Sequence, residues 1–164
     1  MSFLGKVKKK LRNGSWYPFY NTFYEKNNLD PHMILLESRS GKALESNILS
    51  LLKELCQEPY RSFTLVLSVH RDSENEIKEK LQKNSIQGVR FVRTGSVAYY
   101  HALSRAGYLV NDTSFPGRFI KKEGQIYLNT WHGTPLKKMG RDNRPEMVTM
   151  GNVQRNLLDS DYLV

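Results

Sequence analysis

The sequence predicts an α/β protein, organised as a doubly wound and mostly parallel sheet. Short apolar segments typical of buried strands alternate along the chain with helical segments. The chain has 164 residues, of which 39% are hydrophobic and 25% are charged, and this suits a globular domain with its own core. Alternation of this kind favours right-handed crossovers between parallel strands, with a ligand site at the carboxyl ends of the strands.

Residues 1–30 are expected to form an N-terminal segment ahead of the main domain at residues 31–164. The first twelve residues contain five basic side chains and no acidic one, within a net charge of +9 for the whole chain. Their apolar side chains fall on one helical face, as in a basic amphipathic helix that binds an anionic membrane surface. A solvated, frayed N-terminus fits the pattern equally well. We do not expect nucleic acid as a partner, because the aromatic residues are not interleaved with the basic ones.

The next segment is aromatic, and we expect it to pack in a core or an interface. Residues 16–24 include Trp16, Tyr20 and Tyr24. Residues 27–31 are typical of a turn. No run of about 18 apolar residues exists, and the N-terminus lacks the apolar centre of a signal peptide. The single cysteine, Cys56, fits a reducing compartment and is expected to close the apolar face of its helix.

The following segments repeat a strand–helix pattern. Strands are predicted at residues 33–38, 63–69, 89–92 and 108–112, and helices at about 44–56, 73–83 and 97–105. A fifth unit begins with an apolar strand from Ile126, passes through His132-Gly133 and restarts at Thr134-Pro135, which is a helix-start signal. A polar helix is predicted at about 146–159, and residues 161–164 are typical of a strand entering the sheet. We therefore expect the chain to be a piece of a longer protein.

His132 is the strongest candidate for a catalytic residue. A strand end, a Gly turn and a helix start coincide there, so the imidazole would lie beside free backbone N–H groups and the positive end of a helix. Phosphate groups bind at such positions, and histidine can act as a general base at neutral pH. The alternative is a histidine that only hydrogen-bonds its own turn.

The other polar positions after strands carry weaker signals. Ser38 to Lys42 resembles a phosphate-binding turn in composition but lacks the P-loop pattern, so a second anion site and a solvated turn are both open. Asn111 to Ser114 could line the same cleft or form a simple loop. We expect structural or solvated roles for His32, His70 and His101. No metal site is expected, because no His, Cys or carboxylate pair has ligand spacing.

Several of these blocks together resemble the CDP-glycerol glycerophosphotransferases, which build teichoic acid chains in Gram-positive bacteria. The similar blocks span residues 33–164, and the most specific is Trp131-His132-Gly133-Thr134-Pro135-Leu136-Lys137. The resemblance implies a glycosyltransferase architecture of the GT-B type, with two Rossmann-like halves facing a cleft. It covers the N-terminal half only. The C-terminal half of the catalytic domain has no counterpart here, and the chain alone is expected to be inactive.

The resemblance also implies substrates and roles. His132 would accept the proton of a glycerol hydroxyl on a lipid-linked glycerol-phosphate acceptor, which attacks CDP-glycerol and releases CMP. No cofactor is expected, and the enzyme would lie peripherally at the cytoplasmic face of the membrane. A ribitol-phosphate or other polyol-phosphate transferase of the same family stays open, as does a truncated, non-catalytic membrane- or partner-binding module. The substrate-binding positions would be Trp131, Gly133, Thr134, Pro135, Lys137, Ser38, Gly41, Lys42 and Asn111.

Overall fold

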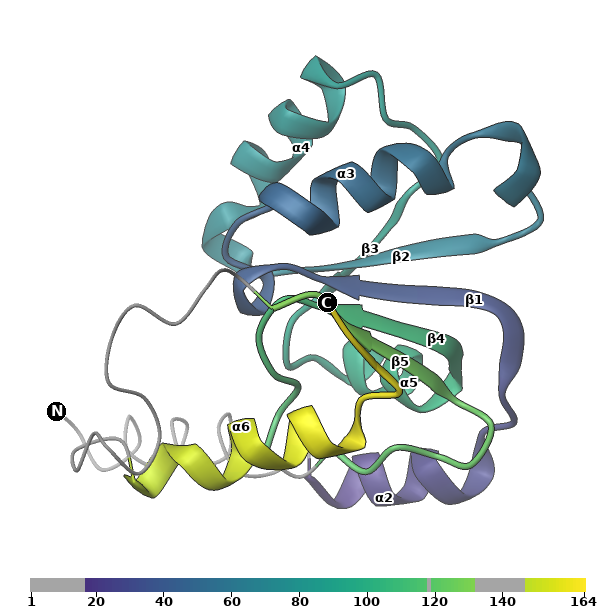
Figure 1. Ribbon diagram of the computed structural model, residues 1–164. Coiled ribbons are helices and arrows are strands. Elements are labelled where there is room, and N and C mark those ends of the chain that lie inside the picture. Colours follow the sequence, from purple (N-terminus) through teal and green to yellow (C-terminus); the bar gives the residue numbers. More distant parts are fainter. Residues whose placement is uncertain (1–16, 118, 132–146) are drawn as a thin grey trace, which may run out of the picture.

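A six-stranded parallel sheet forms the centre of the molecule (Figure 1). The computed structural model describes residues 17–117, 119–131 and 147–164. The strand order is β3-β2-β1-β4-β5-β6, and each neighbouring pair is parallel. This confirms the predicted α/β class. The strands are β1 (Asp30–Glu37), β2 (Thr64–Val69), β3 (Arg90–Arg93), β4 (Ala106–Asn111), β5 (Ile126–Asn129) and β6 (Tyr162–Leu163).

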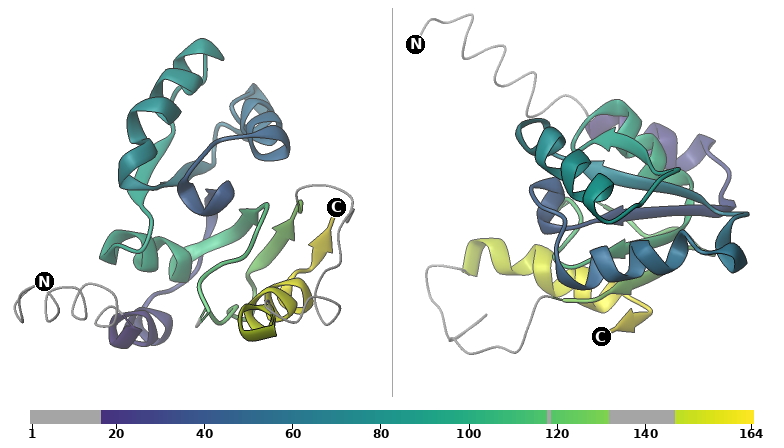
Figure 2. Two further views of the ribbon diagram at one scale, coloured as in Figure 1. Left: turned by 90° about the vertical axis from the view of Figure 1, so that its left-hand side faces the viewer. Right: turned by 90° about the horizontal axis from the view of Figure 1, so that it is seen from above.

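Helices cover both faces of the sheet, as Figure 2 shows with the sheet seen on edge. On one face lie α3 (Ser46–Leu55) and α4 (Glu74–Lys83), which connect β1 to β2 and β2 to β3. On the other face lie α2 (Tyr17–Lys26), α5 (Val97–Arg105) and α6 (Met147–Asp159). The change of face follows from the strand order, because right-handed crossovers that run in opposite directions along a sheet place their helices on opposite sides.

Alternation along the central strands builds two separate cores. Leu36 of β1 faces α3 and α4, where it packs with Ile48 and Leu81, whereas Leu35 faces α2 and α5 and packs with Tyr20 and Tyr99. Successive side chains of a strand point to opposite faces of the sheet. A central strand that is covered on both sides therefore needs a continuous apolar run, which is the pattern that predicts β1 from the sequence.

The predicted strands and helices that lie within the described residues are confirmed to within three residues of their ends, whereas the helix predicted to start at Thr134-Pro135 lies outside the described residues. Two details differ. The aromatic segment forms helix α2, which was not predicted and which packs on α5, with Tyr20 buried and its hydroxyl donating to Ile120 O over 2.8 Å. The predicted turn at 27–31 is shorter, because β1 already begins at Asp30, where it pairs with Ala106, and His32 therefore lies within the strand.

On the face of the sheet that carries α3, no described helix covers one half of the sheet. There an apolar groove of about 380 Å³ is lined by side chains that include Leu55, Phe63, Tyr108, Leu128 and Tyr162. It lies along the strands and offers few polar atoms, so it is unsuited to a phosphate group. Among the described elements, no helix has the length and apolarity needed to cross a bilayer.

Candidate functional site

The site begins where β1 and β4 end side by side. The chain leaves β1 towards β2 on one side, and β4 continues to β5 on the other, so their carboxyl ends flank the point at which the strand order reverses. Open α/β sheets bind their ligands in the crevice outside such a point. Here the crevice is flanked by the loop that starts at Ser38 and by the loop that starts at Asp112.

Asp112 joins these two loops. Its Oδ2 accepts a hydrogen bond from Ser38 Oγ over 2.7 Å, and its Oδ1 accepts one from Arg39 N over 2.8 Å. Asp112 is only 4% exposed, so both bonds form away from solvent and involve an ionisable carboxyl. The carboxyl therefore fixes the start of the β1 loop against the end of β4.

The β1 loop has an unusual backbone conformation. Arg39, Ser40 and Gly41 have φ values of +48°, +54° and +77°, which lie in the left-handed region. Such conformations are unfavourable for residues with a Cβ and persist only where neighbouring contacts hold them. At Gly41 the neighbours also leave no room, because a Cβ there would overlap Thr94 Oγ1 and lie 2.8 Å from His70 N. The glycine is required both for its φ value and for this close approach to β2 and β3.

Glu37 lies beneath the same loop, as the last residue of β1. It is 1% exposed, its neighbours across the sheet are Ser68 and Asn111, and its Oε2 has no hydrogen-bond partner. Burial raises the pKa of Glu37 to about 7, the Ser68 and Tyr99 hydroxyls lower it, and the charge of Asp112 raises it further. The interior therefore favours the protonated, uncharged form of Glu37 over its charged form.

A third polar segment ends β5, next to β4. Asn129 Oδ1 accepts a hydrogen bond from Trp131 N over 2.9 Å, and Thr130 N donates to Asn111 O over 2.8 Å. Asn47, in the first turn of α3, donates from Nδ2 to Thr130 O over 3.2 Å. The end of β5 is therefore tied both to β4 and to the helix that follows the β1 loop. Trp131 itself has a φ of +48° and is half-buried.

Besides Trp131, whose role in substrate binding stays a prediction, the structure brings four predicted site residues to this edge of the sheet. Ser38 is buried and uses its hydroxyl proton on Asp112, and Gly41 donates its N–H to Ser38 O, so both donors are used within the protein. Lys42 is exposed, and Asn111 is completely buried with its Oδ1 bonded to the Tyr127 hydroxyl. Substrate binding by these four residues stays a prediction.

The remaining predicted residues lie outside the described part of the chain. They are His132, Gly133, Thr134, Pro135 and Lys137, which follow Trp131 directly, and the basic segment at residues 1–12. Their roles stay predictions. Of the other histidines, His70 directly follows β2, where its N–H donates to Gly41 O and its Nδ1 accepts from Asp72 N. His101 packs edge-on against Phe23, and His32 lies on β1 near Phe63. Within residues 17–117, 119–131 and 147–164, no three His, Cys, Asp or Glu side chains are grouped to hold a metal ion.

Comparison with known proteins identifies the family. The sequence profile of the family described as CDP-Glycerol:Poly(glycerophosphate) glycerophosphotransferase matches residues 19–164. The chain belongs to this family. It is 31% identical over 123 residues to the teichoic acid poly(glycerol phosphate) polymerase of Staphylococcus epidermidis, and 28% identical over 137 residues to the teichoic acid glycerol-phosphate transferase of Staphylococcus aureus. Solved structures of the wall teichoic acid polymerase TagF have the same fold, one with a TM-score of 0.71 and 26% identity over 98% of this chain.

The chain spans only part of the length of its relatives. It covers 16% of the Staphylococcus epidermidis polymerase, 33% of the Staphylococcus aureus transferase and 38% of the TagF chain. A TagF variant was also solved after a soak with CDPG; it has a TM-score of 0.69 and 25% identity, and this chain covers 43% of it. The chain therefore corresponds to less than half of each of these relatives.

Two residues at this edge of the sheet, Glu37 and Asn129, were not singled out from the sequence, and Asp112 was included only within the segment from Asn111 to Ser114. Each of the three ends a buried strand or directly follows one. The signal that the sequence offered for these residues was a polar side chain at the end of an apolar run. What the sequence could not supply was the strand order, which makes β1 and β5 the two neighbours of β4 and so brings the three residues to one crevice.

Proposed function

We propose that this chain forms one wall of the active site of an enzyme that transfers glycerol phosphate from CDP-glycerol to a lipid-linked glycerol-phosphate acceptor and releases CMP. One observation carries the proposal most strongly. The turn at Trp131, at the carboxyl end of the parallel sheet, begins the segment Trp131 to Lys137, which contains His132 and is the most specific resemblance to the family. The known relatives are named as teichoic acid glycerol-phosphate polymerases and a transferase.

In this proposal the residues around the crevice have separate tasks. His132 accepts the proton of the attacking glycerol hydroxyl, while the backbone N–H groups of Gly133 and Thr134 stabilise charge on the transferring phosphate. Lys137 adds positive charge nearby. The described residues hold this segment in place, because Asp112 fixes the β1 loop and Asn129 fixes the turn at Trp131. Preorganisation of this kind reduces the reorganisation that the reaction would otherwise require.

The test is CMP release from CDP-glycerol in the presence of the lipid-linked acceptor. We expect His132→Ala to reduce release by at least ~100-fold, the lower range for loss of a general base. His32→Ala is the matched control, because His32 is an exposed histidine at the amino end of β1. Equal release by the wild-type chain and a folded His132→Ala variant would contradict the role of His132. If the wild-type chain releases no CMP, calorimetric titration with CDP-glycerol shows whether it holds the donor; no binding would contradict the proposal for this chain.

The donor polyol is a separate question within the same proposal. Replacing CDP-glycerol by CDP-ribitol in the release assay distinguishes glycerol-phosphate transfer from ribitol-phosphate transfer. The names of the relatives favour glycerol phosphate. Faster CMP release from CDP-ribitol would assign this chain to the other polyol.

We further propose that residues 1–12 bind the anionic inner surface of the cell membrane, where a lipid-linked acceptor would lie. The support is the sequence pattern of five basic residues without an acidic one. Cosedimentation with vesicles that contain anionic lipid is the test. Reversal of charge at Lys8, Lys9 and Lys10 should abolish binding, whereas reversal at Lys53 and Lys83, which are exposed on the folded domain, should not. Retained binding by the first variant would contradict the proposal.

A further inference from the structure

Asn129 occupies a special position at the end of β5. Its side chain is completely buried, and both of its polar ends form hydrogen bonds with the chain around it. Oδ1 accepts from Trp131 N over 2.9 Å, and Nδ2 donates to Thr113 O over 2.9 Å and to the Tyr127 hydroxyl over 3.2 Å. One side chain therefore links the main chain after β5 to the main chain after β4.

The bond to Trp131 is made to a residue in an unfavourable conformation. Trp131 has a φ of +48°, and the left-handed region is costly for a residue with a bulky side chain. A side-chain oxygen that accepts from the N–H two residues ahead forms an Asx turn, which is a common means of stabilising a change in chain direction. The acceptor on Asn129 thus supports the backbone that leads from the sheet into His132.

The bonds from Nδ2 determine where this turn lies. Thr113 follows Asp112, so the Asn129 amide ties the Trp131 turn to the same β4 loop that holds the β1 loop. The Tyr127 hydroxyl also lies 2.9 Å from Asn111 Oδ1. The three strand ends around the crevice are therefore connected through buried hydrogen bonds.

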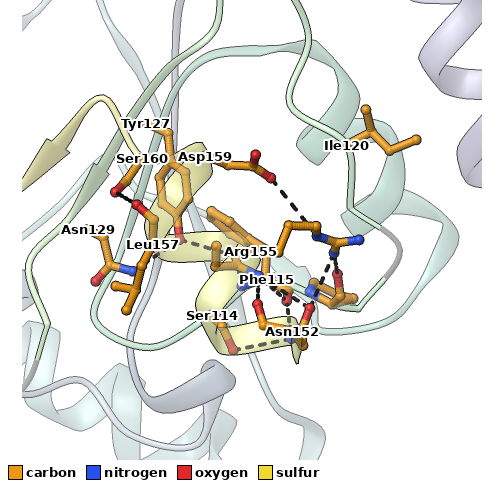
Figure 3. A network of polar contacts seen from close by, with 12 residues as sticks. Ser114, Phe115, Ile120, Tyr127, Asn129, Asn152, Arg155, Leu157, Asp159 and Ser160 are labelled. Carbon is orange, nitrogen blue, oxygen red and sulfur yellow. Dashed lines mark hydrogen bonds and ion pairs between the residues drawn. The ribbon is translucent and has the colours of Figure 1, made fainter. Parts of the chain in front are cut away.

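Helix α6 is joined to the same group of bonds (Figure 3). Asn156 is completely buried, its Oδ1 accepts from Phe115 N over 2.8 Å, and that oxygen lies 3.2 Å from the Tyr127 hydroxyl. Asn152, one turn earlier in α6, donates to Phe115 O over 3.0 Å. The β4 loop is therefore hydrogen-bonded to α6 as well as to β5. This second attachment fixes the loop to which Asn129 ties the Trp131 turn.

We propose that Asn129 is a positioning residue for the transfer reaction: it locks the turn at Trp131, the residue that directly precedes His132 in the sequence, to the loop that follows β4. The catalytic part of this inference rests on the proposed function, whereas the conformational part does not. Buried amides that use all of their hydrogen-bonding groups restrict a site to one geometry. A residue of this kind acts on the rate of a reaction by holding another group in place.

Native-state hydrogen exchange of the Trp131 amide is the first test. Asn129→Ala removes the acceptor, and we expect the Trp131 amide to exchange at least ~10-fold faster relative to the amides of Leu109 and Leu128 in the strand centres. Tyr127→Phe removes the neighbouring hydroxyl but leaves the acceptor, so the relative protection of Trp131 should stay within ~3-fold of wild type. Asn84→Ala is the matched control, since Asn84 Nδ2 donates to Lys80 O over 2.7 Å at the far end of α4.

A role limited to stability gives a different result. In that case Asn129→Ala accelerates exchange at Trp131, Leu109 and Leu128 by the same factor, as Asn84→Ala does, and this outcome would overturn the proposal. If Asn129→Ala does not fold, Asn129→Asp serves instead, because it keeps the acceptor for Trp131 N but cannot donate to Thr113 O in its ionised form. We expect it to retain Trp131 protection; loss of that protection in a folded Asn129→Asp variant also overturns the proposal.

The second test is kinetic and uses the CMP-release assay. We expect Asn129→Ala to lower kcat at least ~10-fold with an unchanged KM for CDP-glycerol, while Asn84→Ala keeps both values. An increase in KM alone would contradict a positioning role for Asn129. If the wild-type chain releases no CMP, titration with CDP-glycerol tests the proposed function instead, and the exchange experiment alone decides the role of Asn129.

Discussion

The buried carboxyl of Glu37 should make this protein less stable as the pH rises from 5 to 8. Burial raises the pKa of Glu37 to about 7 in the folded protein, from an ordinary value of 4.5 that applies to the unfolded chain. Between these values the folded protein holds a proton that the unfolded chain has released, so the free energy of unfolding falls with increasing pH. Above pH 7 the accumulated loss is about 3 kcal/mol, because each tenfold change in proton affinity is worth about 1.4 kcal/mol.

Glu37→Gln isolates this effect, since the amide has a similar shape and does not titrate. The groups that influence the pKa of Glu37 are Ser68 on β2, Tyr99 on α5 and Asp112 after β4, and the substitution leaves all three unchanged. Any pH-independent effect of the new amide on the free energy of unfolding cancels when each protein at pH 8 is compared with the same protein at pH 5. Urea denaturation followed by circular dichroism at pH 5 and pH 8 should show that wild type loses about 2–3 kcal/mol more than Glu37→Gln over this range.

The control is Glu79→Gln, which removes an exposed carboxylate on α4. Its pH dependence should follow wild type within about 0.5 kcal/mol, as is usual for exposed positions. Parallel curves for wild type and Glu37→Gln between pH 5 and pH 8 would refute the argument that Glu37 is held in its protonated form.

Two further predictions concern the β1 loop. Gly41→Ala should destabilise the protein by at least about 3 kcal/mol, because the Cβ would overlap Thr94 Oγ1. Gly88→Ala is the control and should cost only about 1 kcal/mol, because Gly88 has the same φ of +77° but its Cβ would meet nothing within 4 Å. Urea denaturation midpoints of both variants measure the difference. Equal losses would show that the crowding at Gly41 is relieved by movement of Thr94. Asp112→Asn should lower the pKa of Glu37 below that of wild type, because it removes a neighbouring negative charge, and carboxyl ¹³C titration by NMR follows the change. An unchanged or higher pKa would mean that burial alone sets the protonation of Glu37.

Much of the fold was predictable from local pattern. The run around Leu35 and Leu36 indicates a strand that is buried on both sides, and the helix from Ser46 has its apolar residues on one face. Helix α2 was missed because its aromatic residues do not form a distinct apolar face, and its stability comes from packing on α5. Isolated helices of this length are marginal, so tertiary contact decides whether they form.

The site was predictable in outline only. The rule that ligands bind at the carboxyl ends of parallel strands led to Ser38, Asn111 and the segment after Trp131, and the structure places the described members of this set at one edge. The rule did not reveal that the Ser38 hydroxyl is used by Asp112 or that the Asn111 side chain is buried. Those facts depend on which strands are neighbours.

By itself the sequence determined the α/β class, the positions of the strands and the membership of a glycerophosphotransferase family through the motif that begins at Trp131. These features depend on the pattern of residues over short stretches of the chain, and such patterns can be read from the sequence alone. The tertiary structure alone decided that Glu37 is held uncharged, that Asp112 joins two loops and that Asn129 holds the Trp131 turn. Each of these depends on residues brought together from separate strands, because the free energy of a buried polar group is set by the partners that surround it.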